Sequence, residues 1–100
     1  MSYPDVKVKE RLKNYIERDE TGVRKTVLKL FLEDKTYTTE GIYNHLLEQK
    51  FNVSYRGISA MVGLMNMRLG ILSIDVTGNH NVYSLKGGYK KVVASVLENY

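Results

Sequence analysis

The sequence predicts a small α+β domain that is mostly helical and carries one β-hairpin after several helices. Three observations support this fold class. Apolar residues recur at helical spacing through most of the chain, and the pattern changes to the alternation of a strand after residue 70. The chain has 100 residues, which is enough for one hydrophobic core but not for two. We therefore expect a single domain over residues 1–100.

Two amphipathic helices are expected in the first third of the chain. The apolar face of the first, over roughly residues 5–19, is formed by Val8, Leu12, Tyr15 and Ile16. Thr21 follows this helix and is expected to cap the second one by accepting a backbone hydrogen bond. A broader apolar face then runs from Val23 to Phe31, so the second helix should be the most buried. A short segment over 35–37 is expected to run extended.

Two further helices follow, each with a recognisable cap. Thr38 or Thr39 is expected to cap a third helix that ends near Lys50. Ser54 is expected to cap a fourth helix, which Gly70 ends by adopting the left-handed conformation. The buried face of this fourth helix is formed by Ile58, Met61, Val62, Met65 and Leu69.

A β-hairpin is predicted after the fourth helix. In its first strand Leu72, Ile74 and Val76 alternate with Ile71, Ser73 and Asp75. Residues 82–86 form the second strand, and the turn formers of 77–81 make a polar tip. A last helix is expected over 89–100, so helices flank the core of the domain, roughly residues 22–86, on both sides.

Three helices followed by a hairpin, with a three-residue turn between the second and third of those helices, is the order of a winged helix-turn-helix domain. The stretches that resemble small winged-helix regulators are TEGIYNHL (39–46), VSYRGIS (53–59) and LGIL (69–72). The resemblance extends to the DNA-binding half of ferric-uptake-regulator-like proteins and to an uncharacterised archaeal winged-helix family of similar size. It implies that the helix over 54–67 enters the major groove and that the hairpin tip, 77–81, is a wing on the flanking backbone or minor groove.

The composition limits the class of protein. The absence of cysteine excludes disulfides, thiolate metal ligands and a cysteine nucleophile, and it favours an intracellular setting. We find no membrane span and no signal peptide in the sequence, so we expect a cytoplasmic protein. Fifteen Lys and Arg against eleven Asp and Glu give a net charge of +4, which suits an anionic partner.

Catalysis, metals and cofactors are not expected. His45 and His80 are the two histidines, and neither has a second ligand at the spacing of a metal site. Because the metal-ligand clusters of ferric-uptake regulators have no counterpart, metal sensing does not follow from the resemblance. No nucleophile is paired with a base on a common element, and the chain is small for a substrate cleft.

The exposed side of the fourth helix is the most informative place for function. At 100° per residue, the side away from the core holds Arg56, Ser59, Ala60, Gly63, Leu64 and Met67. Arg56 is the one charged residue there, whereas a DNA-reading face usually carries several polar and basic side chains. The residues expected to contact double-stranded DNA are Tyr55, Arg56, Ser59, Asn66, His80 and Lys86. We therefore predict a DNA-binding protein that acts as a transcriptional regulator.

The same helix face supports a rival interpretation. Small and apolar residues favour contact with another helix, so the domain is alternatively a protein-interaction module; a third interpretation is ordinary solvated surface. The residues assigned to a partner interface are Ala60, Gly63, Leu64, Met67, Val93, Val96 and Leu97. The flanking helices are expected to form a homodimer, the alternative being that they pack on each other within one chain.

Overall fold

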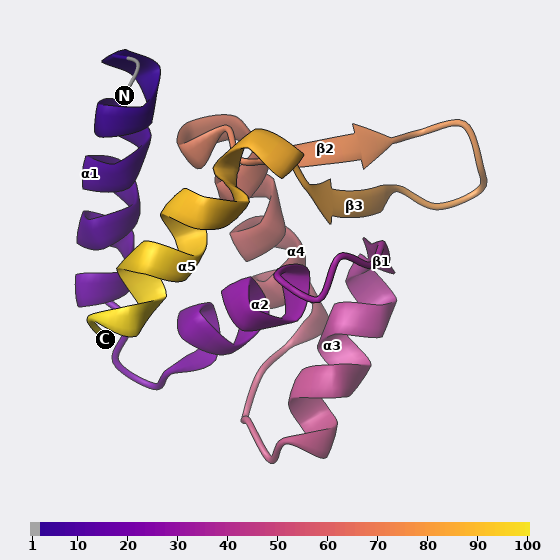
Figure 1. The fold of residues 1–100 in the computed structure, drawn as a ribbon. Coiled ribbons are helices and arrows are strands. Elements are labelled where there is room, and N and C mark those ends of the chain that lie inside the picture. Colours follow the sequence, from indigo (N-terminus) through magenta and orange to yellow (C-terminus); the bar gives the residue numbers. More distant parts are fainter. Residues whose placement is uncertain (1–2) are drawn as a thin grey trace.

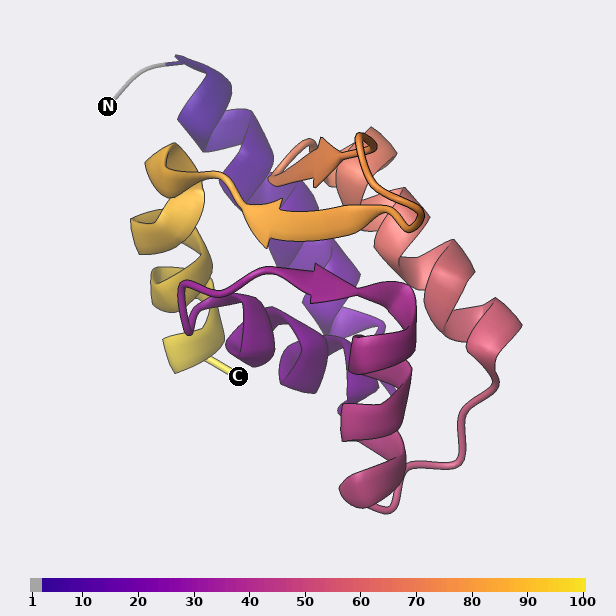
Figure 2. The same cartoon turned by 90° about the vertical axis from the view of Figure 1, so that its right-hand side faces the viewer.

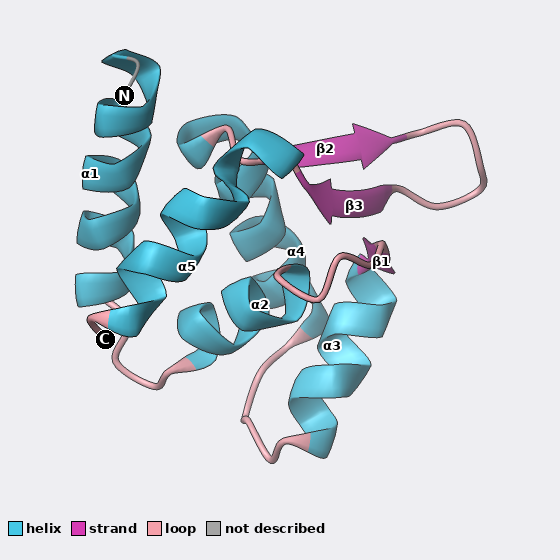
Figure 3. Cartoon of the chain, in the orientation of Figure 1, coloured by secondary structure: helices cyan, strands magenta, loops and turns pink. Residues whose placement is uncertain are grey.

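A computed structural model describes the backbone of residues 3–100 and the side chains from Val6 onward. In this range the chain forms five α-helices and a small antiparallel sheet (Figure 1, Figure 3). The helices are α1 (Tyr3–Glu17), α2 (Val23–Phe31), α3 (Thr39–Glu48), α4 (Tyr55–Leu64) and α5 (Lys90–Glu98). The predicted mostly helical α+β class is therefore confirmed.

The sheet has three strands in the order β1–β3–β2, and both pairings are antiparallel. The strands are β1 (Tyr37–Thr38), β2 (Leu72–Asp75) and β3 (Val82–Leu85). Tyr83 stands in register with Tyr37 on one side and with Ile74 on the other. Figure 2 shows β3 between its two neighbours. The segment expected to run extended thus ends in a strand that links the start of α3 to the hairpin.

The capping predictions for α3 and α4 are confirmed. The Thr38 hydroxyl accepts a hydrogen bond from the Gly41 N–H at 3.0 Å, and the Ser54 hydroxyl accepts one from the Gly57 N–H at the same distance. Each hydroxyl satisfies a backbone donor that has no partner within its helix. These caps fix where the two helices begin.

The cap of α2 is shared between the expected residue and a second one. The Thr21 hydroxyl accepts a long hydrogen bond from the Val23 N–H at 3.4 Å, and the Asp19 carboxylate accepts shorter ones from the N–H groups of Arg24 and Lys25, at 3.2 and 3.1 Å. Gly22 has a φ of 84°, a left-handed conformation that glycine adopts without a steric penalty. This turn folds the chain back, so that an acceptor from the end of α1 reaches the first turn of α2.

The α-helical winding of α4 ends at Leu64, earlier than predicted for the helix over 54–67. It continues as a five-residue π-helical segment, η1 (Met65–Leu69), which ends at Gly70 with a φ of 65°. Met65 and Leu69 are both buried in this wider turn. The expected left-handed glycine and the expected core face of the helix are confirmed.

The helix α5 packs against both α1 and α2 to close one hydrophobic core (Figure 1). Hydrogen bonds tie the end of the chain to both neighbours: the Tyr100 hydroxyl donates to the Glu17 carboxylate at 2.7 Å, and the Lys25 ammonium donates to the Tyr100 carbonyl oxygen at 2.8 Å. The apolar stripes of the flanking helices are therefore covered within one chain.

This packing corrects part of the predicted partner interface. Val93, Val96 and Leu97 are buried in the core of their own chain, so they do not form a surface for a second molecule. The core members from α1 are Val8, Leu12 and Ile16. Of the two alternatives for the flanking helices, packing within one chain is the one observed.

The predicted β-hairpin is confirmed, and its first strand is buried mainly at its base. Ile71 and Leu72, at its base, are both buried, whereas Ile74 and Val76 are 39% and 63% exposed. The outer part of β2 and the loop that follows project beyond the helices (Figure 1). In β2 the alternation therefore does not give a buried side beyond Leu72, whereas Tyr83 of β3 is buried.

Candidate nucleic-acid interface

A polar cleft lies where the starts of α3 and α4 meet the loop between β2 and β3. It has a volume of about 270 Å³. Its lining residues are Thr38, Thr39, Glu40, Tyr55, Ser59, Asn79, His80, Asn81 and Tyr83. Glu40 is the one acidic member, and most of the others carry uncharged groups that donate or accept hydrogen bonds.

The Ser54 cap places Tyr55 and Ser59 on the cleft side of α4. These two residues are four apart, so their side chains lie one above the other on the helix surface. The Tyr55 ring packs edge-on against Tyr43 of α3, with ring centres 5.8 Å apart. It is nevertheless 49% exposed. Tyr55 is thus held in place by α3 while part of its surface stays available to a ligand.

The structure brings together three of the six residues predicted to contact DNA. Tyr55 and Ser59 share the cleft with His80 of the hairpin loop. Arg56 is exposed on the same turn of α4 but does not line the cleft. The cleft therefore combines residues from both elements that the sequence assigned to DNA contact.

Two of the six lie elsewhere. Asn66 is half-buried in η1, and at a rise of about 1.5 Å per residue it sits roughly 16 Å along the helix from Tyr55. Lys86 follows β3 at the base of the hairpin, where its N–H donates to the Ile71 carbonyl oxygen at 2.9 Å. His80 is in the loop at the opposite end of that strand.

The sequence prediction did not select Asn79 and Asn81, although both line the cleft beside His80. The sequence does contain an indication of their role, because residues 77–81 are a run of turn formers with a polar tip. Asparagine amides both donate and accept hydrogen bonds. They broaden the set of polar groups that the loop presents.

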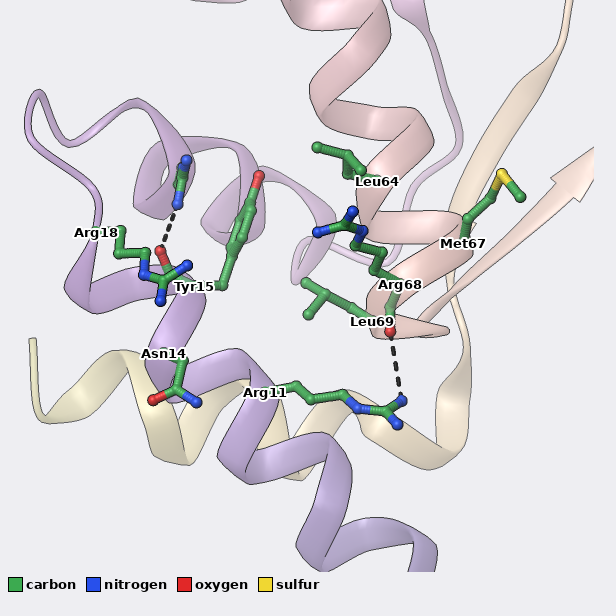
Figure 4. A pocket seen from close by; sticks show the side chains of 9 residues that line it. Arg11, Asn14, Tyr15, Arg18, Leu64, Met67, Arg68 and Leu69 are labelled. Carbon is green, nitrogen blue, oxygen red and sulfur yellow. Dashed lines mark hydrogen bonds between the residues drawn. The ribbon is translucent and has the colours of Figure 1, made fainter.

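A second concave surface lies between α1 and the end of the α4–η1 helix, and we call it the arginine groove. It has a volume of about 620 Å³. Its lining residues are Arg11, Asn14, Tyr15, Arg18, Arg24, Leu64, Met67, Arg68 and Leu69 (Figure 4). The sequence prediction did not select Arg11 and Arg18, yet their spacing of seven residues places them on one side of a helix.

Two of the arginines are held by contacts within the groove. Arg24 donates from Nη1 to the Tyr15 carbonyl oxygen at 2.8 Å, and its guanidinium lies 4.2 Å from the centre of the Tyr15 ring. Arg11 donates from Nη1 to the Arg68 carbonyl oxygen at 3.4 Å. Burial raises the pKa of Tyr15 to about 12, so its hydroxyl stays protonated at neutral pH.

The remaining residues assigned to a partner interface lie on the outer side of α4 and η1. Ala60 is exposed, Leu64 is 43% exposed and Met67 is 84% exposed. A Cβ atom at the half-buried Gly63 would meet nothing within 4 Å. The expected solvent-facing side of the helix is confirmed for Ala60, Leu64 and Met67, whereas Gly63 is only partly exposed.

Within residues 3–100, no three or more His, Asp or Glu side chains gather where they could hold a metal ion. None of the helices in this range has the length and apolar character that would let it cross a membrane.

Comparison with known proteins gives the family of this chain. It belongs to the family described as "Protein of unknown function (DUF2551)", whose model matches residues 12–93. A relative from Archaeoglobus fulgidus, named as an uncharacterized protein, is 42% identical over 93 residues, which is 93% of this chain and 95% of the relative. No solved structure matches the chain. The prediction of an uncharacterised archaeal family is confirmed.

Proposed function

We propose that this protein is a winged helix-turn-helix DNA-binding protein that acts as a transcriptional regulator. In this proposal α4 enters the major groove of double-stranded DNA and the loop between β2 and β3 is the wing. The observation that carries the proposal is the shared polar cleft, in which Tyr55 and Ser59 of α4 face the same space as His80 of the loop. A helix and a loop that act on one duplex must converge in this way.

The chemistry of the cleft suits a nucleic acid. Hydroxyl, amide and imidazole groups contact phosphate oxygens and base edges in protein–DNA complexes. Arg56, exposed beside the cleft, supplies a permanent positive charge for a phosphate. The α3 and α4 helices both begin at the cleft. The positive end of the α4 dipole adds to the attraction for an anion, because the first turn of α4 has no acidic residue, whereas Glu40 offsets the dipole of α3.

Duplex binding at two salt concentrations tests this proposal. The probe is a labelled pool of genomic duplex fragments, followed by fluorescence anisotropy at about 50 and 200 mM salt, where several phosphate contacts give a steep loss of affinity. Binding that is absent, or insensitive to salt, contradicts the proposal.

Variants of α4 and of the loop locate the binding surface. Arg56→Gln and His80→Ala are each expected to weaken binding by about fivefold, because each removes one contact. Lys13→Gln, which removes a charge from the exposed side of α1, is the control for Arg56→Gln. Equal losses for Arg56→Gln and Lys13→Gln would indicate a general charge effect rather than contact through α4.

A protein-interaction module is the second candidate, favoured by the exposed Leu64 and Met67 on the outer side of the α4–η1 helix. Because the space around Gly63 is open, Gly63→Arg should leave the fold intact while it blocks a partner. Light scattering and pull-down of the wild type and this variant test the idea. A complex that survives the substitution rejects this second function.

A further inference from the structure

The arginine groove has a different character from the polar cleft, and DNA contact through the cleft does not require it. Its walls come from three separate parts of the chain: α1, the first turn of α2, and the α4–η1 helix. Ligand pockets in proteins are typically about 300–1,000 Å³, and the groove, at about 620 Å³, lies within that range.

Four guanidinium groups line the groove, and no lining residue is acidic. A guanidinium remains ionised at any physiological pH, so the positive charge of the groove is permanent. Asp19 and Glu17, which flank Arg18 in the sequence, accept hydrogen bonds from the α2 backbone and from the Tyr100 hydroxyl rather than from the arginines, so their charges offset those of the groove only in part. The positive charges around the groove repel one another, and a bound anion would relieve that repulsion.

Two of the four guanidinium groups remain available. Arg24 is stacked on Tyr15, and Arg11 donates to the Arg68 carbonyl oxygen. The side chains of Arg18 and Arg68 form no hydrogen bond or ion pair within the described residues. Figure 4 shows Arg68 opposite Tyr15 across the groove, and Arg18, which directly follows α1, on the other side of the Tyr15 ring. Free guanidinium groups bind carboxylate, sulfonate and phosphate oxygens, often through two parallel hydrogen bonds.

The middle of the groove is apolar. Leu64 and Leu69 lie opposite the Tyr15 ring in Figure 4, and Leu64 is partly exposed there. Leu69 is buried, so the exposed apolar surface here comes from Leu64 and part of Tyr15. An inorganic ion would leave this surface in contact with water, whereas a ligand with an apolar body would cover it and gain the free energy of apolar burial. The groove thus offers complementary surfaces for both parts of an amphipathic molecule.

We propose that the arginine groove binds a small amphipathic anion, that is, an apolar or aromatic body that carries a carboxylate, sulfonate or phosphate group. Arg68 binds the charged group, and Arg18 adds positive charge beyond the Tyr15 ring. The Tyr15 ring and the exposed part of Leu64 contact the apolar body. The site is independent of the proposed DNA contact, but it shares the α4–η1 helix with it.

Anilinonaphthalene sulfonate is a suitable probe, because it joins an aromatic body to one permanent negative charge and its fluorescence rises in an apolar site. Phenylnaphthylamine has the same aromatic body without the sulfonate and is the matched control. We expect saturable binding of the sulfonate by the full chain, weakened by salt. The neutral compound should bind at least about tenfold more weakly, as loss of a charge-assisted contact implies. Equal affinities for the two compounds would overturn the proposal.

Variants locate the probe. Arg18→Gln and Arg68→Gln are each expected to weaken sulfonate binding by about fivefold or more, whereas Lys13→Gln, an equal loss of charge on α1, leaves it unchanged. Leu64→Asp, which adds a carboxylate to the groove, should abolish binding. Thermal unfolding of each variant checks that it folds, and a variant that does not fold is replaced by Arg18→Lys or Arg68→Lys, which keep the charge but lose the paired donors. Equal affinities of the groove variants and Lys13→Gln for the sulfonate probe would overturn the proposal.

Competition separates a small-molecule site from a macromolecular one. Inorganic phosphate should displace the probe weakly, because it contacts the arginines alone. If duplex DNA or an acidic peptide displaces the probe at stoichiometric concentration while small aromatic carboxylates do not, the groove is a macromolecular contact and the proposal is wrong. Failure of DNA binding in the cleft would leave all of these outcomes unaffected.

Discussion

The Arg24 guanidinium lies over the Tyr15 ring, 4.2 Å from its centre, and the same side chain donates a hydrogen bond to the Tyr15 carbonyl oxygen at 2.8 Å. One residue of α2 therefore holds the end of α1 through both its charge and its hydrogen-bonding capacity. A cation over an aromatic face and a charge-assisted hydrogen bond are both stabilising.

This pair predicts the effect of replacing Arg24. Arg24→Ala should lower the free energy of unfolding by about 1–3 kcal/mol, since it removes both contacts and leaves a carbonyl oxygen without its donor. Arg24→Lys should lose less, because lysine keeps the charge but not the planar group. Urea unfolding followed by circular dichroism gives both values. A loss for Arg24→Ala no greater than for Lys29→Ala, on the exposed side of α2, would contradict this assignment.

The Tyr15 phenol predicts a change of stability at alkaline pH. Burial raises its pKa from 10.0 to about 12, the Asp19 carboxylate adds to the rise and Arg24 opposes it. Because the folded pKa is the higher one, this stabilisation is fully present below pH 10 and is lost as the pH rises through about 12.

Tyr15→Phe should therefore show a smaller alkaline loss of stability than the wild type. Denaturant unfolding between pH 9 and 12 measures the difference, and absorbance titration of the phenolates should lose one late-titrating tyrosine. Tyr37 and Tyr100 also have raised pKa values and are common to both proteins. Identical alkaline profiles would show that Tyr15 does not titrate late.

The unexpected cap of α2 predicts an order of stabilities. Asp19→Ala should cost about 1 kcal/mol, a typical loss for a helix cap, because it removes the acceptor for two backbone N–H groups. Thr21→Ala should cost less, since its hydroxyl accepts a single hydrogen bond, from the Val23 N–H, at the longer distance of 3.4 Å. Thermal unfolding of the two variants gives the order, and a greater loss for Thr21→Ala would restore the cap expected from the sequence.

Local features of the fold were predictable because their causes are local. Thr38 and Ser54 cap helices that begin directly after them, and Gly70 ends a helix by its own conformation. Asp19 was missed because its reach to α2 depends on the left-handed turn at Gly22. Apolar periodicity likewise showed that α5 buries a face, but it carried no information on whether the covering helix comes from the same chain.

The two candidate sites also differ in how far they can be predicted from the sequence. The outer side of α4 follows from helical geometry, so Ser59 and Arg56 were found from the sequence. The arginine groove depends on the approach of α1 to η1, two segments far apart in the chain. Spacing placed Leu69 on the core face of the helix, but neither the π-helical winding around Arg68 nor the approach of α1 has a signal in the spacing of residues.

The packing of α5 predicts how a core variant behaves. Val96→Ala should lower the free energy of unfolding by about 1–3 kcal/mol, because it leaves a cavity in the core of a single chain. Its molar mass by light scattering should equal that of the wild type. A change of oligomeric state without loss of stability would instead support the dimer through the flanking helices.

Removal of the negative charge of Glu40 should strengthen DNA binding rather than weaken it. Its carboxylate lines the cleft and is exposed, so it opposes the approach of phosphate and offsets the positive end of the α3 dipole. Glu40→Gln should strengthen duplex binding by about two- to fivefold at low salt, and the gain should shrink as salt screens the charge. Its cost in stability should be below about 1 kcal/mol, because one favourable dipole contact is lost.

The matched control for this prediction is Glu48→Gln, which makes the same change of charge at the far end of α3, where the side chain is exposed and outside the cleft. A general increase in positive charge would raise the affinity of both variants equally. A gain confined to Glu40→Gln places phosphate at the cleft, because a charge effect of that kind falls off within about 10 Å at moderate salt. Anisotropy titrations of both variants therefore decide whether the duplex approaches α3 and α4 from this side. Equal gains for the two variants, or a loss of affinity for Glu40→Gln, would contradict that approach.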